Sequence, residues 1–114
     1  MECKPGALVF VPFPYSDLKT SKKRPVLVLT VPDKYGDFIG LAVTSVQTDE
    51  HAVRIENPDL LQGSLPKASW IRVDKIFTLS QNSIVKVFGF LTPAAMDRVL
   101  NGLCRRLGCT DAKG

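Results

Sequence analysis

The chain has 114 residues, near the commonest size of a single domain, and 45% of them are hydrophobic. This composition is ordinary for a globular protein and excludes a chain that is disordered throughout. Fifteen Lys and Arg residues against eleven Asp and Glu residues give a formal net charge of +4, which favours a polyanionic partner only modestly. We therefore expect one domain spanning residues 1–114.

Simple counts also bear on location and on metal sites. No stretch approaches the ~20 consecutive apolar residues that a membrane helix needs, and the start MECKPGALVF does not resemble a secretion signal, so we expect a cytoplasmic protein that does not bind membranes. Three cysteines without a C-x-x-C spacing and a single histidine predict neither a disulfide framework nor a zinc site. We expect no cofactor and no metal.

Most of the chain has the pattern of short strands separated by turns. The run PVLVLTV at residues 25–31 is almost continuously apolar, which is typical of a strand buried on both faces. The polar runs at residues 15–24 (YSDLKTSKKR) and 57–69 (NPDLLQGSLPKAS) predict loops. The expected strands are residues 6–14, 25–31, 38–46, 52–56, 70–79 and 84–91.

The period changes from two residues to that of a helix after Thr92. Thr92 suits the N-cap, Pro93 the first turn and Gly108 the C-terminal stop. One helical face would carry Met96, Val99, Leu100, Leu103 and Leu107. Five or six strands followed by one helix, without helical crossovers, predict a mainly β (α+β) domain built as a small, curled, mostly antiparallel sheet or barrel.

The segment WIRVDKIF, residues 70–77, carries charges inside a strand pattern. Alternate side chains of a strand share a face, so one face holds Trp70, Arg72 and Asp74. The opposite face, with Ile71, Val73 and Phe77, is expected to join the core. The first face is either a solvated surface or a site.

Three polar clusters are candidates for chemistry: Lys22–Arg24, Thr44 with Ser45, and Arg72 with Asp74. Each also has a structural interpretation. A basic run in a hairpin loop is usually solvated, hydroxyls at a strand end cap backbone groups, and a surface ion pair contributes about 0–1 kcal/mol. Taken singly, the clusters leave both interpretations open.

Five segments occur in an order that resembles the MazF/PemK-type toxins, the endoribonuclease half of bacterial type II toxin–antitoxin pairs. They are GALVFVPFPYSDL, KKRPVLVL, LAVTS, LPKASWIRVDKIFTL and VFGFLTPAAMDRVLNGLCRRLG, and they cover nearly the whole chain. Ala7 departs from the pattern, since relatives often carry an acidic residue there. The resemblance implies an SH3-like barrel of five to seven strands with a C-terminal helix. It also implies a homodimer that cleaves single-stranded RNA (mRNA) at short motifs without metal. Its other partner would be a cognate antitoxin, with DNA contacted only through the toxin–antitoxin complex.

The resemblance also supplies site residues by their place in the motifs. Residues that it implicates in catalysis or RNA binding map onto Arg24, Thr44, Ser45, Arg72 and Asp74. Candidates for substrate binding are Phe13, Tyr15, Lys22, Lys23, Gln47, Trp70 and Lys75. For Trp70, stacking on an RNA base and packing in a dimer contact or core corner stay equally open, and core packing is favoured for Phe13.

Metal-free RNA cleavage can use the 2′-hydroxyl of the substrate against the adjacent phosphorus. It needs a base, positive charge on the phosphorane oxygens and a donor toward the leaving 5′-oxygen. Asp74 is the only acid in the three clusters and is therefore the candidate base, although burial would raise its pKa and Arg72 would lower it. Arg72 can hold a phosphate bidentately, Arg24 on its loop can supply a second cation, and Thr44 and Ser45 can donate hydrogen bonds.

Two other classes of function remain as alternatives. A toxin of the same barrel fold can act without catalysis by binding DNA gyrase, and a degenerate relative can keep RNA or antitoxin binding while losing activity. The KKRP and RVD clusters favour the nuclease, because gyrase poisons do not carry them in this arrangement.

Overall fold

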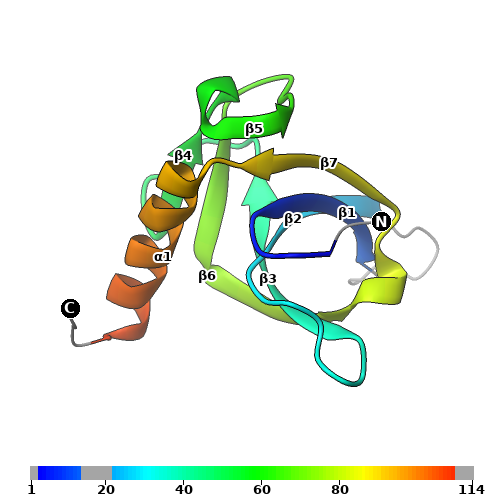
Figure 1. Cartoon of the computed structure of the whole chain (residues 1–114). Coiled ribbons are helices and arrows are strands. Elements are labelled where there is room, and N and C mark those ends of the chain that lie inside the picture. The colour runs from blue at the N-terminus through cyan, green and yellow to red at the C-terminus, as the bar shows by residue number, and fades with distance from the viewer. Residues whose placement is uncertain (1–2, 14–21, 110–114) are drawn as a thin grey trace.

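The computed structural model describes residues 3–13 and 22–109, which form seven strands, two single-turn 3₁₀ helices and one α-helix (Figure 1). Tyr15, a candidate for substrate binding, lies outside these residues. The elements in chain order are β1 (Ala7–Phe13), β2 (Lys22–Val28), β3 (Asp37–Thr44), β4 (Ala52–Ile55), η1 (Asn57–Asp59), β5 (Leu60–Gly63), β6 (Ser69–Ser80), η2 (Gln81–Ser83), β7 (Lys86–Leu91) and α1 (Pro93–Leu107).

All seven strands belong to one curled sheet in the order β4-β6-β3-β2-β1-β7-β5. Every neighbouring pair is antiparallel. The curl brings β7 over β1 and β2, and α1 lies beside β4 and β6 (Figure 1). The predicted mainly β architecture, a curled antiparallel sheet followed by a C-terminal helix, is confirmed. Among the described residues, no helix is long and apolar enough to cross a membrane.

The curl gives the sheet two buried apolar layers. β2 contributes to both, because Leu27 lies in one cluster while Val26 and Val28 lie in the other. This confirms burial on both faces for the part of the predicted strand that ends at Val28, but the predicted end at Val31 was wrong, since Val31 lies beyond β2 and is exposed. The first cluster, against which α1 packs, contains Leu8, Leu27, Leu41, Val43, Ile55, Leu65, Ile71, Val73, Leu91, Ala95 and Val99. The second contains Ala7, Val9, Val11, Val26, Val28, Phe38 and Ile84.

Helix α1 begins and ends at the predicted residues. The Thr92 hydroxyl accepts a hydrogen bond from the Ala95 N–H at 3.1 Å, and Gly108 ends the helix in the left-handed region, with φ 76°. Glycine at position 102 permits a close approach to the sheet, because a Cβ there would lie 3.1 Å from Cγ2 of Val53.

The predicted apolar face of α1 is only partly covered. Val99 is fully buried, and Met96 and Leu103 pack against the first core cluster. Leu100 and Leu107, in contrast, are 41% and 61% exposed. The C-terminal half of the helix therefore presents an apolar stripe to solvent.

Two segments predicted as loops contain strands. Residues Lys22–Arg24 belong to β2, where Lys22 pairs with Phe13 and Arg24 with Val11. In the second predicted loop, β5 pairs with β7. Both predictions were wrong, because strand pairing uses backbone hydrogen bonds, and neither the basic run KKR nor the four residues LLQG show the apolar alternation that marks a strand.

Strand β6 contains an irregularity that shapes the site. Leu41 and Ala42 are neighbours on β3, but they pair with Ile76 and Arg72, which are four residues apart on β6. The intervening residues 73–75 therefore bulge out of the β3 pairing. Within the bulge, the Val73 N–H bonds the His51 carbonyl oxygen at 2.9 Å. Such bulges bend a strand and re-aim its side chains.

Candidate active site

The polar face of β6 holds a bidentate ion pair. The Arg72 guanidinium donates to the Asp74 carboxylate from Nε to Oδ1 at 3.3 Å and from Nη2 to Oδ2 at 3.2 Å. The two side chains are 29% and 19% exposed, so the pair is shielded yet remains open to a ligand. On the opposite face, Ile71 and Val73 are buried, as the alternation predicted. The prediction was wrong for Phe77, which packs against the second core cluster and lines the smaller hollow with Arg72, because the bulge interrupts the alternation.

Opposing influences set the pKa of Asp74. Burial of the carboxyl group acts to raise the pKa. The hydrogen bond and charge of Arg72, the backbone N–H of Asp74 and the charge of Lys75 lower the pKa, and together they outweigh the effect of burial. The pKa of Asp74 therefore lies below its ordinary value, and the group is ionised at neutral pH. A ligand that drew Arg72 away would leave the effect of burial in place and would raise this pKa.

Two adjoining hollows, together called the groove, cross the sheet beside this pair. One has a volume of about 320 Å³ and the other of about 270 Å³. They share Arg24, Pro25, Val43 and Thr44, and the smaller one reaches Arg72. The four basic residues that line the groove are Arg24, Lys67, Arg72 and Lys75, and no carboxylate lines it among the described residues.

Strand register explains why residues from three separate motifs meet here. Ala42 of β3 pairs with Val26 of β2 on one side and with Arg72 of β6 on the other. Arg24 lies two residues before Val26 on β2, and Thr44 lies two residues after Ala42 on β3. Because β2 and β3 are antiparallel, both offsets run in the same direction in space. Because side chains two residues apart share a face, Arg24, Thr44 and Arg72 lie on one surface.

Lys75 reaches the groove through the bulge in β6. In a regular strand, Lys75 would point away from Arg72, since the two positions differ by an odd number of residues. The residues between Arg72 and Ile76 have no opposite residue on β3, and both Arg72 and Lys75 line the smaller hollow. The bulge thus adds a second cation beside the ion pair.

The groove also contains residues that sequence reasoning missed. The rings of Phe10 and Phe88 stack with centroids 4.3 Å apart and line the larger hollow. Lys67 lines the same hollow from the segment between β5 and β6. Nothing in the local pattern marks the two phenylalanines, because aromatic residues in strands usually serve the core. Lys67 lay within the LPKAS segment of the resemblance, which was the only signal for it.

The hydroxyl groups of Thr44 and Ser45 lie at the end of β3, where they can cap the backbone or bind a ligand. Thr44 Oγ1 accepts a hydrogen bond from the Val46 N–H at 3.1 Å, which is the backbone-capping role considered for a strand end. Its O–H can still donate, and both Thr44 and Ser45 line the larger hollow.

The other predicted binding residues lie around the groove. Trp70 is half-buried on the face of Arg72, opposite Thr44, and the Arg54 guanidinium covers its ring at 5.7 Å from the centroid. Lys22 and Lys23 are exposed at the start of β2, and Phe13 ends β1. Gln47 is exposed in the turn after β3, where its amide donates to Asp49 at 3.4 Å. Trp70, Lys22, Lys23 and Gln47 are not among the described residues that line the groove.

In residues 3–13 and 22–109, no three His, Cys, Asp or Glu side chains come together as a set that could hold a metal ion. The chemistry of the groove is instead that of an anion site. Guanidinium and ammonium groups surround an apolar floor, and hydroxyls lie at one edge. Such a surface fits a phosphate backbone with bases that stack on aromatic rings.

Comparisons with known proteins agree with this fold. A search of curated proteins by sequence finds no match. The structure is similar to an endoribonuclease from a mycobacterial species in complex with its cognate antitoxin, with a TM-score of 0.71 and 18% identity over 96% of this chain and 98% of that chain. It is also similar to the Mycobacterium tuberculosis toxin MazF-mt6, with a TM-score of 0.71 and 16% identity over 92% of this chain and 99% of the other.

A third solved structure, MazF from Deinococcus radiodurans, aligns with a TM-score of 0.66 and 19% identity over 93% of this chain and 96% of that chain. At these identities the likeness is one of fold. Residues 4–107, in addition, match the model of the PemK-like, MazF-like toxins of type II toxin–antitoxin systems. The chain therefore belongs to the PemK/MazF-like toxin family.

Proposed function

We propose that this toxin is a metal-independent, sequence-specific endoribonuclease that cleaves single-stranded RNA. The observation that carries the proposal is the groove itself, where Arg24, Lys67, Arg72 and Lys75 meet over an apolar, aromatic-lined floor. Arg72 also holds the carboxylate of Asp74 beside the groove. The similar mycobacterial structures are named as endoribonucleases, which supports the same activity here.

In the proposed reaction, the 2′-hydroxyl attacks the adjacent phosphorus. The O–P bond to the 2′-oxygen forms, the bond to the 5′-oxygen breaks, and the leaving oxygen takes up a proton. Arg72 binds the non-bridging oxygens, where negative charge develops, and Arg24 and Lys75 add positive charge from the neighbouring positions. Thr44 and Ser45 donate hydrogen bonds to the same phosphate or to the 2′-hydroxyl.

The base in this mechanism is Asp74, activated by the substrate. In the free protein, Arg72 holds both carboxylate oxygens and keeps the pKa of Asp74 low. A substrate phosphate that takes Arg72 as its partner removes this effect while the burial of Asp74 persists. The pKa then rises toward the working pH, and the carboxylate becomes a better acceptor for the 2′-hydroxyl proton.

The aromatic pair Phe10 and Phe88 offers a wall on which an unpaired base can stack. Base stacking on an aromatic side chain contributes about 1–3 kcal/mol. Lys67, in the same hollow, is placed to meet a neighbouring phosphate. Choice of the cleaved motif would therefore arise in the larger hollow, and bond breaking in the smaller one.

The decisive experiment is cleavage of a mixed-sequence single-stranded RNA by purified protein in excess EDTA, followed by sequencing of the product ends. The Arg72→Ala variant is compared with Arg98→Ala, which removes another 3.2 Å arginine–carboxylate pair away from the groove. We expect cleavage at a recurring short motif by wild type and Arg98→Ala, and none by Arg72→Ala. A folded wild-type protein that leaves the RNA intact would contradict the proposal and favour a non-catalytic toxin, with DNA gyrase as the next target.

We also propose that a cognate antitoxin covers the groove with an acidic or amphipathic peptide segment. Structures of relatives include complexes with a cognate antitoxin, and the basic lining of the groove here suits such a segment. An acidic antitoxin peptide should then compete with RNA, and the competition should weaken in Arg24→Ala. Simultaneous binding of both ligands would exclude a shared surface.

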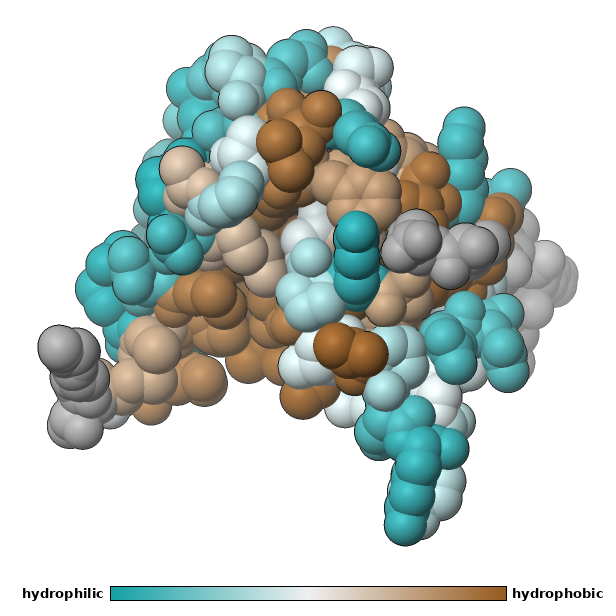
Figure 2. Space-filling model, in the orientation of Figure 1, coloured by the Kyte–Doolittle hydropathy of each residue, from teal (hydrophilic) through white to brown (hydrophobic). Residues whose placement is uncertain are grey.

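A homodimer is the third part of the proposal. Figure 2 shows an apolar area beside the C-terminal half of α1. Leu100 and Leu107 of this half of the helix are exposed. A second copy that covered this area would remove the apolar surface from water. Leu107→Glu should shift the protein toward monomer in sedimentation experiments. Val31→Glu, a comparably exposed site on the β2–β3 connection, should not.

A further inference from the structure

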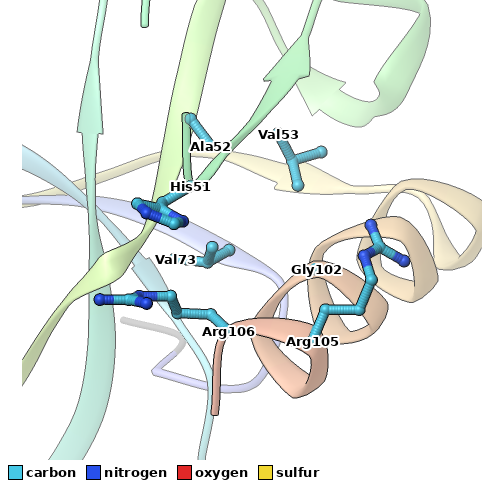
Figure 3. Close-up of a pocket in the computed structure, with 7 residues that line it drawn as sticks. All are labelled: His51, Ala52, Val53, Val73, Gly102, Arg105 and Arg106. Atoms are coloured by element: carbon cyan, nitrogen blue, oxygen red, sulfur yellow. The ribbon is translucent and has the colours of Figure 1, made fainter. Parts of the chain in front are cut away.

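A second basic hollow lies on the other side of β6 from the groove. This cavity, of about 330 Å³, lies between the start of β4, the bulged part of β6 and the last two turns of α1. Its lining residues are His51, Ala52, Val53, Val73, Gly102, Arg105 and Arg106 (Figure 3). Val73 faces it, whereas the neighbouring Arg72 faces the groove, so the two hollows are separate.

The polar lining of the cavity is entirely basic. Figure 3 shows the Arg106 side chain extending to the same side as the His51 imidazole, while Arg105 flanks the cavity on the side of the helix. Val53 and Val73 form an apolar floor. In the described part of the chain, no carboxylate lines this space, and a cavity of this size has room for roughly ten water molecules or one small anion.

The arginines of the cavity differ from most others in the described chain. Arg54, Arg72 and Arg98 each pair with a carboxylate at 3.2 Å. Arg105 and Arg106 make no side-chain hydrogen bond or ion pair with any described residue. Arg24 resembles them, and it lines the groove. Within residues 3–13 and 22–109, the guanidinium groups without a carboxylate partner are thus those that line the two basic hollows.

The backbone at His51 gives a second, independent sign of a built site. His51 has φ 56°, and it is the only residue other than glycine with positive φ in the described segments. The bond from the Val73 N–H to its carbonyl oxygen ties this conformation to the bulge in β6. An unfavourable backbone conformation that is held by its surroundings is typical of functional positions.

We propose that this cavity binds a phosphate oxyanion. The Arg106 guanidinium and the His51 imidazole, which extend to the same side, can donate hydrogen bonds to tetrahedral oxygens, and Arg105 adds positive charge from the side of the helix. The helix C-terminus favours cations there on its own, but it does not require a facing histidine or a hollow between them. The inference goes beyond the proposed nuclease activity and does not depend on RNA cleavage.

The test uses His51, which is the only histidine in the chain and so gives unambiguous imidazole signals in ¹H–¹³C spectra. Wild-type protein is titrated with inorganic phosphate against chloride, at constant pH and ionic strength. The Arg105→Ala/Arg106→Ala variant is compared with Lys34→Ala/Lys86→Ala, which removes the same charge from exposed sites elsewhere. We expect saturable shifts in wild type and the lysine variant, and at least a fivefold weaker response in the arginine variant. Equal shifts in all three proteins, or none in wild type, would overturn the proposal.

A second arm identifies the source of the phosphate. Six-residue thymidine oligodeoxynucleotide replaces inorganic phosphate as the probe, because it lacks the 2′-hydroxyl and cannot be cleaved by the proposed reaction. Shifts at His51 that require Arg105 and Arg106 would assign the cavity to a nucleic-acid backbone. Shifts with inorganic phosphate alone would assign it to a small phosphate ligand. Neither result depends on nuclease activity, so failure of the proposed function is recognised separately by the cleavage assay.

Discussion

The groove and the cavity are two basic hollows built in different ways. In the groove, Arg72 is fixed by two hydrogen bonds to Asp74. Arg72 occupies a paired position of β6, and Asp74 lies in the bulge that follows it. In the cavity, Arg105 and Arg106 come from the last turn of one helix and have no such bond. The first arrangement holds a cation at a defined position, whereas the second leaves its cations able to adapt.

This difference separates chemistry from binding. Stabilisation of a transition state requires charges that are already oriented before the reaction, since reorienting them would cost free energy at that moment. Attraction of a flexible polyanion has no such requirement and gains mainly from the number of cations. The groove therefore suits the proposed reaction, and the cavity suits the proposed binding of phosphate alone.

The largest effect expected is on Asp74. Asp74→Asn should lower kcat by about 10²–10⁴-fold, the usual contribution of a general base, and should leave the fold intact. In wild type, the pKa of Asp74 is held low until substrate takes Arg72. The acid limb of kcat, which reports the bound state, should therefore lie at higher pH than the acid limb of kcat/KM. Measurement of both profiles from pH 4 to 8 checks this.

The cavity provides the control for that prediction. Arg105→Ala/Arg106→Ala should keep both acid limbs and should change kcat little at saturating RNA. If Asp74→Asn retains near wild-type kcat, Asp74 is not the base. Its remaining role would then be to position the Arg72 guanidinium.

A smaller loss is expected for the second cation of the groove. Arg24 has no carboxylate partner among the described residues, so Arg24→Ala should not destabilise the fold. Loss of one charged hydrogen bond to phosphate costs about 1.5–3 kcal/mol, which predicts a roughly tenfold to hundredfold fall in kcat/KM. Lys23→Ala, at the adjacent exposed position of β2, is the matched control and should be close to neutral in the same steady-state assay.

The salt dependence of oligonucleotide affinity should show whether the cavity arginines contact the nucleic-acid backbone, separately from the two groove arginines. Single-stranded nucleic acid loses affinity with a log–log salt slope of about 0.7 per phosphate contact. Arg105→Ala/Arg106→Ala should therefore reduce the slope by up to about 1.4 for binding of an uncleavable oligonucleotide, without altering motif preference. Fluorescence anisotropy across a salt series measures this. A slope like that of Lys34→Ala/Lys86→Ala would place the oligonucleotide away from the cavity.

The smallest effect concerns stability in acid. Because the folded pKa of Asp74 is lowered, its contribution to stability is fully present above the ordinary aspartate pKa and is lost as pH falls through the folded value. Asp74→Asn lacks this contribution, so the wild-type advantage, about 1 kcal/mol or less for a partly exposed pair, should vanish as the pH falls from above the ordinary aspartate pKa through the lower folded pKa. Urea unfolding at several pH values tests it.

The cavity variant should show no such change, because no described carboxylate lines that hollow. Asp59→Asn should behave like Asp74→Asn. Burial acts to raise the pKa of Asp59, but its hydrogen bonds to the Glu56 backbone and Arg98 outweigh burial and leave this pKa below its ordinary value. A pH-independent difference between wild type and Asp74→Asn would show that the ion pair contributes nothing measurable.

Several features of this protein followed from local sequence. Helix α1 was located to its residues, because Thr92 and Gly108 are chemical signals for its ends and the apolar period lies between them. The two faces of β6 around Arg72 also followed, since alternation in a strand is a property of the backbone. The groove residues Arg24, Thr44 and Arg72 were marked by polar side chains in an apolar pattern, and the resemblance to known toxins connected them.

Tertiary structure decided what local pattern does not encode. The bulge that turns Lys75 into the groove depends on how β3 pairs with β6, and the cavity depends on the close approach that Gly102 permits between α1 and the sheet. The net pKa of Asp74 required both its burial and the distance to Arg72. Each of these arises from contacts between segments far apart in the chain, and the periodicity of a single segment carries no information about its partner.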